Sequence, residues 1–205
     1  MSARLKDVPK KGEVTRLAIE DAALELFMEQ GYHATSMRQI ADETELALGG
    51  IYNHFSSKED IFAAIIVDKH PYKQILPLIL AAKGDTAEEL IRNAARALVT
   101  ELGNRPELLK LLFIEIVEFN GKHIARLIKE IAPRLLPMFE RLVRVRRNLR
   151  DIPPPILLRS FLGMFFSFYF TELFIKDSII GKLMPKNSFD LFVDIYLHGV
   201  VKESA

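Results

Sequence analysis

The stretch TRLAIEDAALELFMEQGYHATSMRQIADETELALGGIYNHFSSKEDIFAAII, residues 15–66, decides the fold. Its first part repeats apolar residues at spacings of three and four, which indicates an amphipathic helix from about Thr15 to Gln30. Thr15 is the expected N-cap, because its hydroxyl can accept a hydrogen bond from an otherwise unpaired backbone N–H. Gly31 is expected to end the helix, since glycine adopts the left-handed C′ conformation without steric cost. The expected buried stripe is Leu17, Ala18, Ala22 and Leu26, with Ile19, Ala23 and Phe27 beside it.

Two short helices and a fourth helix follow at once. Ser36 and Gln39 have the capping-box spacing, in which each side chain binds the backbone N–H of the other residue. After a tight connection over residues 45–47, a third short helix carries residues 48–55. Ser57 is the expected cap of the fourth helix, whose acidic first turn suits the helix dipole.

Helices of this length and spacing describe a helix-turn-helix, which places its second short helix in the major groove of DNA. Ile51 and Phe55 lie four residues apart and supply the buried side of the third helix. Gly49 and Gly50 remove side chains where the backbone can approach a duplex closely. We therefore predict a DNA-binding domain in this stretch.

The same stretch resembles, without a gap, the DNA-binding domain of the TetR family of transcriptional repressors. The resemblance is most specific at GYHATSM (residues 31–37), IA (40–41) and IYNHFSSKE (51–59). It implies an all-α homodimer, with a helix-turn-helix domain at residues 1–60 and a larger effector-binding and dimerisation domain at residues 61–205. It also implies that an effector bound in the second domain moves the two DNA-binding domains apart and releases a palindromic operator.

Carried over by position, the resemblance implies two kinds of DNA contact. The residues that would bind backbone phosphates are Thr35, Ser36, Arg38, Tyr52, His54 and Lys58. The residues that would face bases or the groove wall are Leu48, Gly49, Gly50 and Asn53. Phosphate contacts fix register and carry no sequence information directly, so only the second group can specify an operator. Lys58 opens a helix, where its ammonium and the positive end of the helix dipole together suit a phosphate.

The chain departs from the usual family pattern just before the third helix. Glu45 stands where glycine is usual, Ala47 replaces a serine or threonine cap worth about 1 kcal/mol, and Leu48 replaces a common lysine. Residues 1–60 hold seven Lys and Arg against eleven Asp and Glu, a net charge of −4, whereas a DNA-binding face normally carries a basic footprint. We therefore expect modest affinity and a readout in which Leu48 contacts a thymine methyl group.

The composition excludes several classes of site. The chain has 205 residues, 28 Lys and Arg, 27 Asp and Glu, 49% apolar residues and no cysteine. The absence of cysteine excludes disulfides, zinc–thiolate sites and cysteine nucleophiles. The basic N-terminus leads into no apolar run, and the most apolar stretch, residues 156–175, is interrupted by Arg159 and Glu172. We therefore expect a cytoplasmic protein without a signal peptide or membrane span.

Beyond residue 60 the sequence predicts further helices and no strand. The expected helices cover about residues 87–102, 106–120, 122–149, 156–177 and 188–202, which gives about nine in all. Phenylalanines cover all sides of the helix at 156–177, which favours burial on every side. The resemblance implies that this helix and the last one form a four-helix bundle with a second copy, and the alternative is a core helix of a monomer.

The expected effector pocket combines acidic, aromatic and histidine side chains. Its residues are Glu115, Phe119, His123, Phe165, Tyr169 and Glu172. The abundance of Phe, Leu and Ile favours an apolar effector such as a fatty acyl chain, an aromatic compound or a lipophilic drug. Glu115, Glu118 and His123 lie on neighbouring turns, but a metal site needs three or more converging ligands. We predict no metal and no cofactor.

Two other functions stay open at this point. An all-helical enzyme acting on an apolar substrate would need a nucleophile–base pair or a metal, and the sequence contains no GxSxG, no HExxH and no cysteine. A TetR-like protein with degenerate DNA binding would act through protein contacts. The acidic residues 1–60 and the missing cap at Ala47 are compatible with this second alternative.

Overall fold

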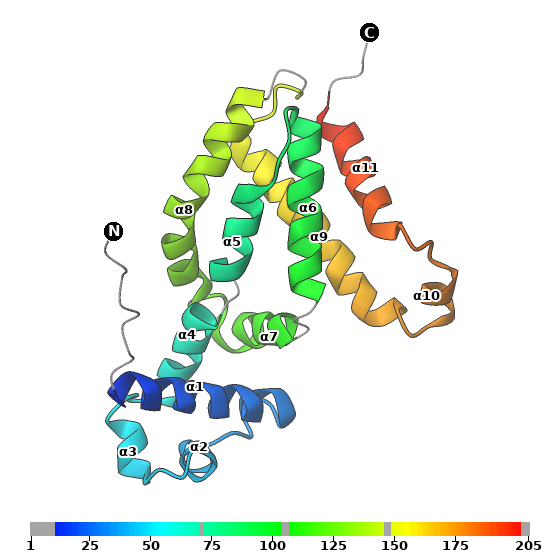
Figure 1. The fold of residues 1–205 in the computed structure, drawn as a ribbon. Helices are drawn as coiled ribbons and strands as arrows, with labels where there is room; N and C mark the ends of the chain where they lie inside the picture. The colour runs from blue at the N-terminus through cyan, green and yellow to red at the C-terminus, as the bar shows by residue number, and fades with distance from the viewer. Residues whose placement is uncertain (1–10, 70–71, 104–106, 146–148, 202–205) are drawn as a thin grey trace, which may run out of the picture. The chain divides into compact units, whose positions relative to one another are not determined.

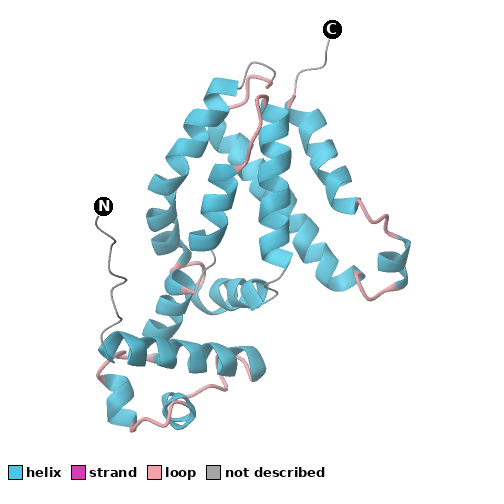
Figure 2. Cartoon of the chain, viewed as in Figure 1, coloured by secondary structure: helices cyan, strands magenta, loops and turns pink. Residues whose placement is uncertain are grey.

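The computed structural model describes residues 11–69, 72–103, 107–145 and 149–201, and this part of the chain forms eleven α-helices (Figures 1 and 2). The first four are α1 (Lys11–Glu29), α2 (Met37–Glu43), α3 (Leu48–Tyr52) and α4 (Lys58–Asp68). The next four are α5 (Tyr72–Ala81), α6 (Ala87–Gly103), α7 (Glu107–Phe119) and α8 (Ile124–Val145). The last three are α9 (Pro154–Ile175), α10 (Ile179–Leu183) and α11 (Ser188–Val200). The prediction of an all-α fold is confirmed.

The helices pack as two compact units. The first unit holds α1 to α4, which we call the head, together with residues 110–128 from α7, the following turn and the start of α8. The second unit holds the described residues of 72–109 and 129–201. These are units of packing, so the predicted division of function between residues 60 and 61 stays a prediction.

The core of the head is built on one face of α1. Ile19, Ala23 and Phe27 follow each other at four-residue spacing and are buried where α1 packs against α4. Two predictions for this helix are wrong. Leu17 and Ala18 of the expected buried stripe are exposed, and the helix begins four residues before Thr15, whose hydroxyl donates to the Lys11 carbonyl at 3.0 Å as an interior residue.

Residues with positive φ end α1 and α7. Gly31, two residues after the end of α1, has φ of +87°, which confirms the predicted stop. Asn120 and Gly121 follow α7 with φ of +51° and +78°. Asparagine and glycine are the residues that tolerate this left-handed conformation best. The turn from α7 into α8 is therefore set by its own residues.

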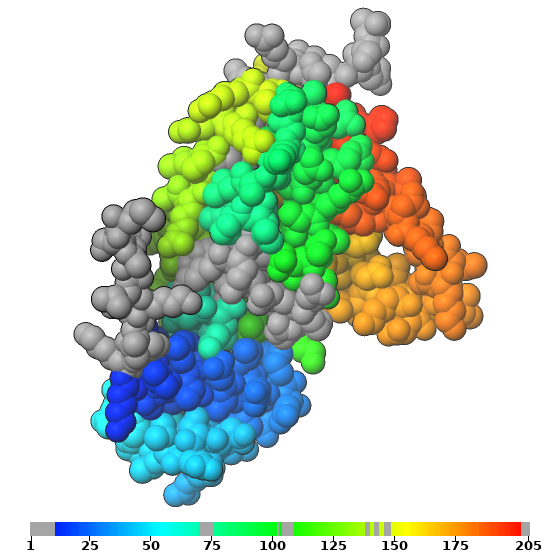
Figure 3. Space-filling view, in the orientation of Figure 1, coloured from blue at the N-terminus to red at the C-terminus, as the bar shows by residue number. Residues whose placement is uncertain are grey.

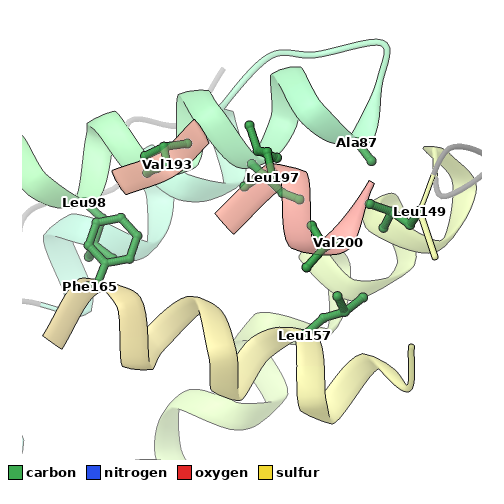
Figure 4. Close-up of a cluster of buried hydrophobic side chains, with 10 residues drawn as sticks. Ala87, Leu98, Leu149, Leu157, Phe165, Val193, Leu197 and Val200 are labelled. Atoms are coloured by element: carbon green, nitrogen blue, oxygen red, sulfur yellow. The ribbon is translucent and has the colours of Figure 1, made fainter. Parts of the chain in front are cut away.

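In the second unit, α6, α9 and α11 share one hydrophobic core (Figure 4). Figure 4 shows Leu98 of α6 and Phe165 of α9 close to Val193 of α11. On the surface, Arg92 pairs with Asp194 at 2.7 Å, and one turn along Arg96 pairs with Asp190 at 3.0 Å. The remaining buried residues of this core are Ala87, Ile91, Ala95, Leu149, Leu157, Leu197 and Val200.

The boundaries of the last helices differ from those predicted. α9 begins at Pro154, because proline fits the first turn of a helix, where its missing N–H is not needed. The additional helix α10 was not predicted, although Ser178 caps it by accepting from the Gly181 N–H at 3.2 Å. Together with α5 it raises the number from about nine to the eleven in the described residues.

Helix α9 is the one helix of the described residues that is long and apolar enough to cross a membrane. In the structure Leu157 and Phe165 anchor it in the core of the second unit, while most of its other side chains are exposed or half-buried. A helix that is apolar all round favours burial on every side. The predicted burial of α9 on all sides is therefore not met within one copy of the chain.

Candidate nucleic-acid interface

The N-terminus of α2 is closed by the predicted capping box. The Gln39 N–H donates to Ser36 Oγ at 3.2 Å, and the Ser36 N–H donates to Gln39 Oε1 at 2.8 Å. Both orphan donors at this helix end are therefore satisfied inside the chain. The side chains of Ser36 and Arg38 are exposed beside the cap, where phosphates can reach them.

The turn between α2 and α3 is strained at Glu45. Its φ is +55°, the left-handed conformation that glycine would adopt without cost. For a residue with a Cβ this conformation costs on the order of 1 kcal/mol. The turn is held by the Leu46 N–H, which donates to the Ala41 carbonyl at 3.0 Å, and by the Thr44 hydroxyl, which donates to the Ile40 carbonyl at 2.9 Å. The sequence departure at Glu45 thus has a structural cost.

Helix α3 is anchored on one side and open on the other. Ile51 and Phe55 are buried, as their spacing predicted. Ala47 occupies the N-cap and makes no side-chain capping bond. The short α3 therefore depends on its packing, because isolated short helices are unstable in water.

The open side of α3 presents an unusually accessible backbone. Leu48 is 37% exposed and Tyr52 is 52% exposed. A Cβ built on Gly49 would meet no atom within 4 Å, and one on Gly50 would meet only Leu46 Cβ at 3.8 Å. In the space-filling view α2 and α3 (cyan) form one face of the first unit (Figure 3). The two glycines thus leave room on this face for close approach of a partner.

The third helix is shorter than predicted. α3 ends at Tyr52, and Asn53 is its C-cap, with an N–H that donates to the Gly49 carbonyl at 3.2 Å. Asn53 is exposed, whereas His54 is half-buried. His54 turns toward the first turn of α1, with its Cε1 4.0 Å from the position of a Cβ on Gly12.

Thr35 lies inside the head. It is 2% exposed, and its hydroxyl donates to the Gly31 carbonyl at 2.9 Å and accepts from Gln30 Nε2 at 3.2 Å. This hydroxyl therefore closes the loop between α1 and α2. We leave Thr35 out of the proposed DNA interface for this reason.

Lys58 also makes its contacts inside the head. Its ammonium donates to the carbonyls of Tyr32 and Thr35, the second at 2.6 Å, and lies 4.2 Å from the centre of the Tyr32 ring. Burial lowers the pKa of Lys58, and the nearby Glu118 carboxylate opposes that shift. Tyr32 was not among the predicted site residues. The place of Tyr32 in the GYHATSM motif could have pointed to it as a site residue. The sequence did not show that the Lys58 ammonium would lie over its ring.

Arg16 and Glu20 reduce the number of acidic groups exposed on the head. Glu20 is fully buried and pairs with Arg16 at 3.2 Å, while Arg16 also reaches Asp68 at 3.8 Å. The Arg16 guanidinium lies 4.4 Å from the centre of the Phe55 ring, at the end of the α3 region. Burial raises the pKa of Glu20 to about 6, with the Asp68 charge adding to the shift. The net charge of −4 therefore overstates the negative charge that DNA would meet.

Glu115 and His123, two predicted effector residues, form a buried cap in the first unit. Glu115 Oε1 accepts from the backbone N–H groups of His123 and Ile124, at 2.6 and 3.3 Å. Its Oε2 lies 2.8 Å from His123 Nδ1. A carboxylate at a helix N-terminus satisfies orphan donors and suits the helix dipole. The structure gives both residues a role in starting α8.

Phe119, a third predicted effector residue, belongs to an aromatic cluster of the first unit. Its ring stacks on Phe62 at 4.9 Å and meets the edges of Tyr32 at 5.0 Å and His123 at 4.8 Å. Phe62 in turn contacts Phe27 at 5.8 Å. This cluster joins the end of α7 to α1 and α4.

The other three predicted effector residues lie in the second unit. Phe165 is buried in its core, with ring contacts to Phe161 at 4.7 Å and Phe189 at 5.4 Å. Tyr169 is half-buried, with its hydroxyl 3.6 Å from the position of a Cβ on Gly103, and Glu172 is exposed. The six residues thus divide between the two units, three in each. Their joint role as a pocket stays a prediction.

The structure gives no support for a metal site in the part of the chain that it describes. No group of three or more His, Asp and Glu side chains there is arranged to hold an ion. Glu115 and His123 contact each other, while Glu118 pairs with His33 instead.

Comparisons with known proteins agree with this geometry. The sequence profile described as "Bacterial regulatory proteins, tetR family" matches residues 19–65, which contain most of the head. The transcriptional regulator UidR of Escherichia coli (strain K12) is 36% identical over 63 residues, or 31% of this chain. That match spans 32% of UidR, so the chain matches about a third of the length of the curated relatives first found.

Similarity to solved structures extends over nearly the whole chain. A TetR-family regulator from Shewanella sp. PV-4 is 18% identical, covers 92% of this chain and 99% of its own, and superposes with a TM-score of 0.68. The SmeT–triclosan complex is 25% identical, covers 93% of both chains and superposes with a TM-score of 0.64. The capped α2, the open α3 and the matched profile identify residues 19–65 as a DNA-binding domain of the tetR family of bacterial regulatory proteins, and the rest of the described chain shares the fold of solved TetR-family structures.

Proposed function

We propose that this chain is a ligand-responsive transcriptional repressor that binds a palindromic DNA operator as a homodimer. The dimer would place two copies of α3 in successive major grooves, with half-sites one helical turn apart or a multiple of it. A small apolar effector would release the operator. The protein would act in the cytoplasm.

The open face of α3 is the single observation that carries the proposal. Leu48, Gly49, Gly50 and Tyr52 lie on it, and buried Ile51 fixes it to the head from behind. A groove-reading helix has to combine these properties, because its exposed side must approach base edges closely. In this arrangement Leu48 would contact thymine methyl groups, while Tyr52 would hold a phosphate.

The remaining DNA contacts follow from exposure. Ser36, Arg38 and Asn53 are exposed on the same pair of short helices or directly after them. We propose Ser36 and Arg38 as phosphate contacts and Asn53 as a base or groove-wall contact. His54 is half-buried and would have to reach a phosphate with its outer edge.

Homodimerisation through α9 and α11 would cover a large apolar surface. Large apolar side chains are exposed along both helices and the α10 segment between them: Ile156, Leu162, Phe166, Leu173, Phe174, Ile179, Ile180, Leu183, Met184, Leu191 and Ile195. Soluble monomers rarely expose large contiguous apolar patches. Packing against the same helices of a second copy would bury this surface and place two heads on one operator.

An apolar effector is supported by the composition and by one relative. The solved SmeT complex holds triclosan, an aromatic and lipophilic molecule. We propose an effector of the same chemical character for this chain. Tyr169 and Glu172 stay as predicted effector contacts. Glu115, Phe119, His123 and Phe165 take part in the packing contacts described above.

Selection from a randomised duplex pool at fixed salt, followed by sequencing, tests the proposal. A recovered palindrome is the expected result. A folded dimer that enriches no sequence would instead favour the alternative of a TetR-like protein acting through protein contacts. The enzyme alternative has no counterpart among the relatives described above, which are transcription regulators.

Repeating the selection with Leu48→Gln sharpens the test. A base-reading side chain is worth about 1–3 kcal/mol of discrimination, so this variant should enrich a different base at one position of each half-site. Tyr52→Ala should weaken binding to all duplexes alike, because a phosphate contact carries no sequence information. An unchanged operator with Leu48→Gln would remove Leu48 from the proposed readout.

A further inference from the structure

Lys58 lies at the start of α4, yet its ammonium reaches back to the loop that connects α1 and α2. It binds the carbonyls of Tyr32 and Thr35 and covers the face of the Tyr32 ring. Two of its three N–H donors are used by these carbonyls. The aromatic face adds a cation–π contact, which is stronger where the cation is partly desolvated.

The Thr35 carbonyl belongs to the peptide unit that begins the capping box. Its carbon is bonded to the nitrogen of Ser36, and the N–H on that nitrogen donates to Gln39 Oε1 at 2.8 Å. Lys58 therefore fixes one end of a peptide plane, while the capping box of α2 fixes the other. Because peptide units are planar, holding the carbonyl also sets the direction of the Ser36 N–H.

The loop contains few other contacts that could hold the Thr35–Ser36 peptide in place. Apart from the capping box and Lys58, residues 31–36 are held by the Thr35 hydroxyl with Gly31 and Gln30, by the Thr35 N–H to the Tyr32 carbonyl at 3.3 Å, by the Ile40 N–H to the Ser36 carbonyl at 3.1 Å, and by the pair of His33 with Glu118. Among these hydrogen bonds, those of Lys58 connect the loop to α4. They are also charge-assisted, which makes them stronger than the neutral hydrogen bonds of the loop.

We infer that Lys58 is a positioning residue for DNA binding, which holds the start of α2 in place through the Thr35–Ser36 peptide and does not itself bind a phosphate. This inference rests on the proposed function. It assigns Lys58 a different role from the phosphate contact that the family resemblance implies. Loss of Lys58 would displace the Ser36 cap, which follows this peptide directly, while the long side chain of Arg38 would still reach its phosphate.

The salt dependence of operator binding separates the two roles. Each phosphate contact contributes about 0.9 to the slope of log K against log salt. A dimer contains two copies of Lys58, so loss of a phosphate ligand in Lys58→Met would reduce the slope by about 1.8. Loss of a positioning residue is expected to weaken operator binding by about tenfold or more with the slope unchanged.

Three variants make this measurement specific. Arg38→Gln is the comparison for a true phosphate ligand, and its slope should fall by about 1.8. Lys69→Met removes the same charge from the other end of α4 and should leave operator binding near wild type. Tyr32→Leu removes the ring below the ammonium without changing any charge, and should weaken operator binding in the same way as Lys58→Met.

A second readout needs no DNA. Hydrogen exchange of the free protein is expected to show faster exchange in a peptide covering residues 33–41 of Lys58→Met, with residues 19–27 of α1 unchanged. Unchanged exchange at 33–41, a slope reduced by about 1.8, or operator affinity equal to wild type would each overturn the inference. A wild-type protein that binds no operator would refute the proposed function alone, since the exchange measurement would still decide the position of the loop.

Discussion

The head leaves few large apolar side chains exposed, whereas the α9–α11 region leaves many of them exposed. Over residues 11–68 the head leaves four large apolar side chains exposed, two of them on α3. Over residues 154–200 the α9–α11 region leaves eleven exposed. The head also satisfies its helix ends internally, at Ser36, at Ser57 and through Lys58. One region is complete as a single copy, and the other has an apolar surface that a single copy does not bury.

This difference supports the places that we propose for the two kinds of partner. A DNA-binding face needs rigid, small and exposed groups, because the partner is polar and the fit is made at base edges. A subunit interface needs apolar area, because burial of that area drives association. The chain separates these requirements along its length, so changes in one region should leave the other function measurable.

The largest expected effect is loss of the dimer. Phe174 and Ile195 are 68% and 72% exposed in α9 and α11, and Phe174→Glu with Ile195→Glu would place carboxylates in the proposed interface. Burying an unpaired charge costs several kcal/mol, so we expect a monomer by light scattering and a loss of operator affinity of at least about 100-fold. The matched control is Ile128→Glu with Leu136→Glu, both exposed on α8. A double variant that stays dimeric would contradict the proposed dimer interface on α9 and α11.

The next effect tests whether Glu115 is a structural cap or an effector contact. Glu115→Ala would leave two backbone donors and His123 without their buried partner, and breaking a buried pair typically costs about 3–5 kcal/mol. Glu115→Gln keeps the Oε1 acceptor and should cost less. Urea unfolding measures both, with the exposed Glu25→Ala as the control. A stable Glu115→Ala protein would contradict the structural assignment.

An intermediate effect is expected from the buried carboxyl of Glu20. Its pKa is raised to about 6 from an ordinary value of 4.5, so the folded state holds a proton that the unfolded state has already lost. The contribution of Glu20 protonation to the free energy of unfolding is therefore full below about pH 4.5. It is lost as pH rises to about 6, a decrease of roughly 2 kcal/mol.

Glu20→Gln removes this dependence. The difference in unfolding free energy between Glu20→Gln and wild type should increase by up to about 2 kcal/mol between pH 4.5 and pH 7. Glu25→Gln, on the exposed side of the same helix, should show no such trend. A constant difference across this range would mean that Glu20 titrates normally in the folded head.

The smallest expected effect concerns the strained turn. Glu45→Gly should stabilise the head by about 0.5–1 kcal/mol, because glycine adopts φ of +55° without a clash between Cβ and backbone. Asp42→Gly, inside α2, should instead destabilise it by a similar amount, about 0.5–1 kcal/mol. Thermal unfolding compares the two. Destabilisation by Glu45→Gly would show that the side chain contributes more than the strain costs.

Local signals made much of the fold predictable. Gly31 ends α1, and the capping box of Ser36 and Gln39 starts α2, because each depends on residues a few positions apart. Helix starts without such a signal were placed less well. Thr15 proved to be an interior residue, and α10 was missed although Ser178 caps it. Propensity alone does not fix the ends of a helix when its neighbours pack against it.

The site was predictable where exposure follows from helical spacing. Ile51 of α3 and Phe55 just after it are buried, and Leu48 and Tyr52 are exposed, as the spacing of these residues predicts. The roles of Thr35 and Lys58 were not predictable in this way. Their partners are backbone carbonyls of the loop that precedes α2, and no sequence pattern records such contacts.

The sequence by itself determined the all-α class, the helix-turn-helix and the TetR-like DNA-binding domain, because these depend on periodicity, caps and a continuous motif of about fifty residues. Only the tertiary structure decided which charged side chains make their contacts inside the head and which apolar side chains stay exposed in a single copy of the chain. Glu20 is buried against Arg16, and Lys58 closes a loop 23 residues before it in the chain. Burial and long-range pairing depend on how helices pack, and the order of residues within one helix does not specify that packing.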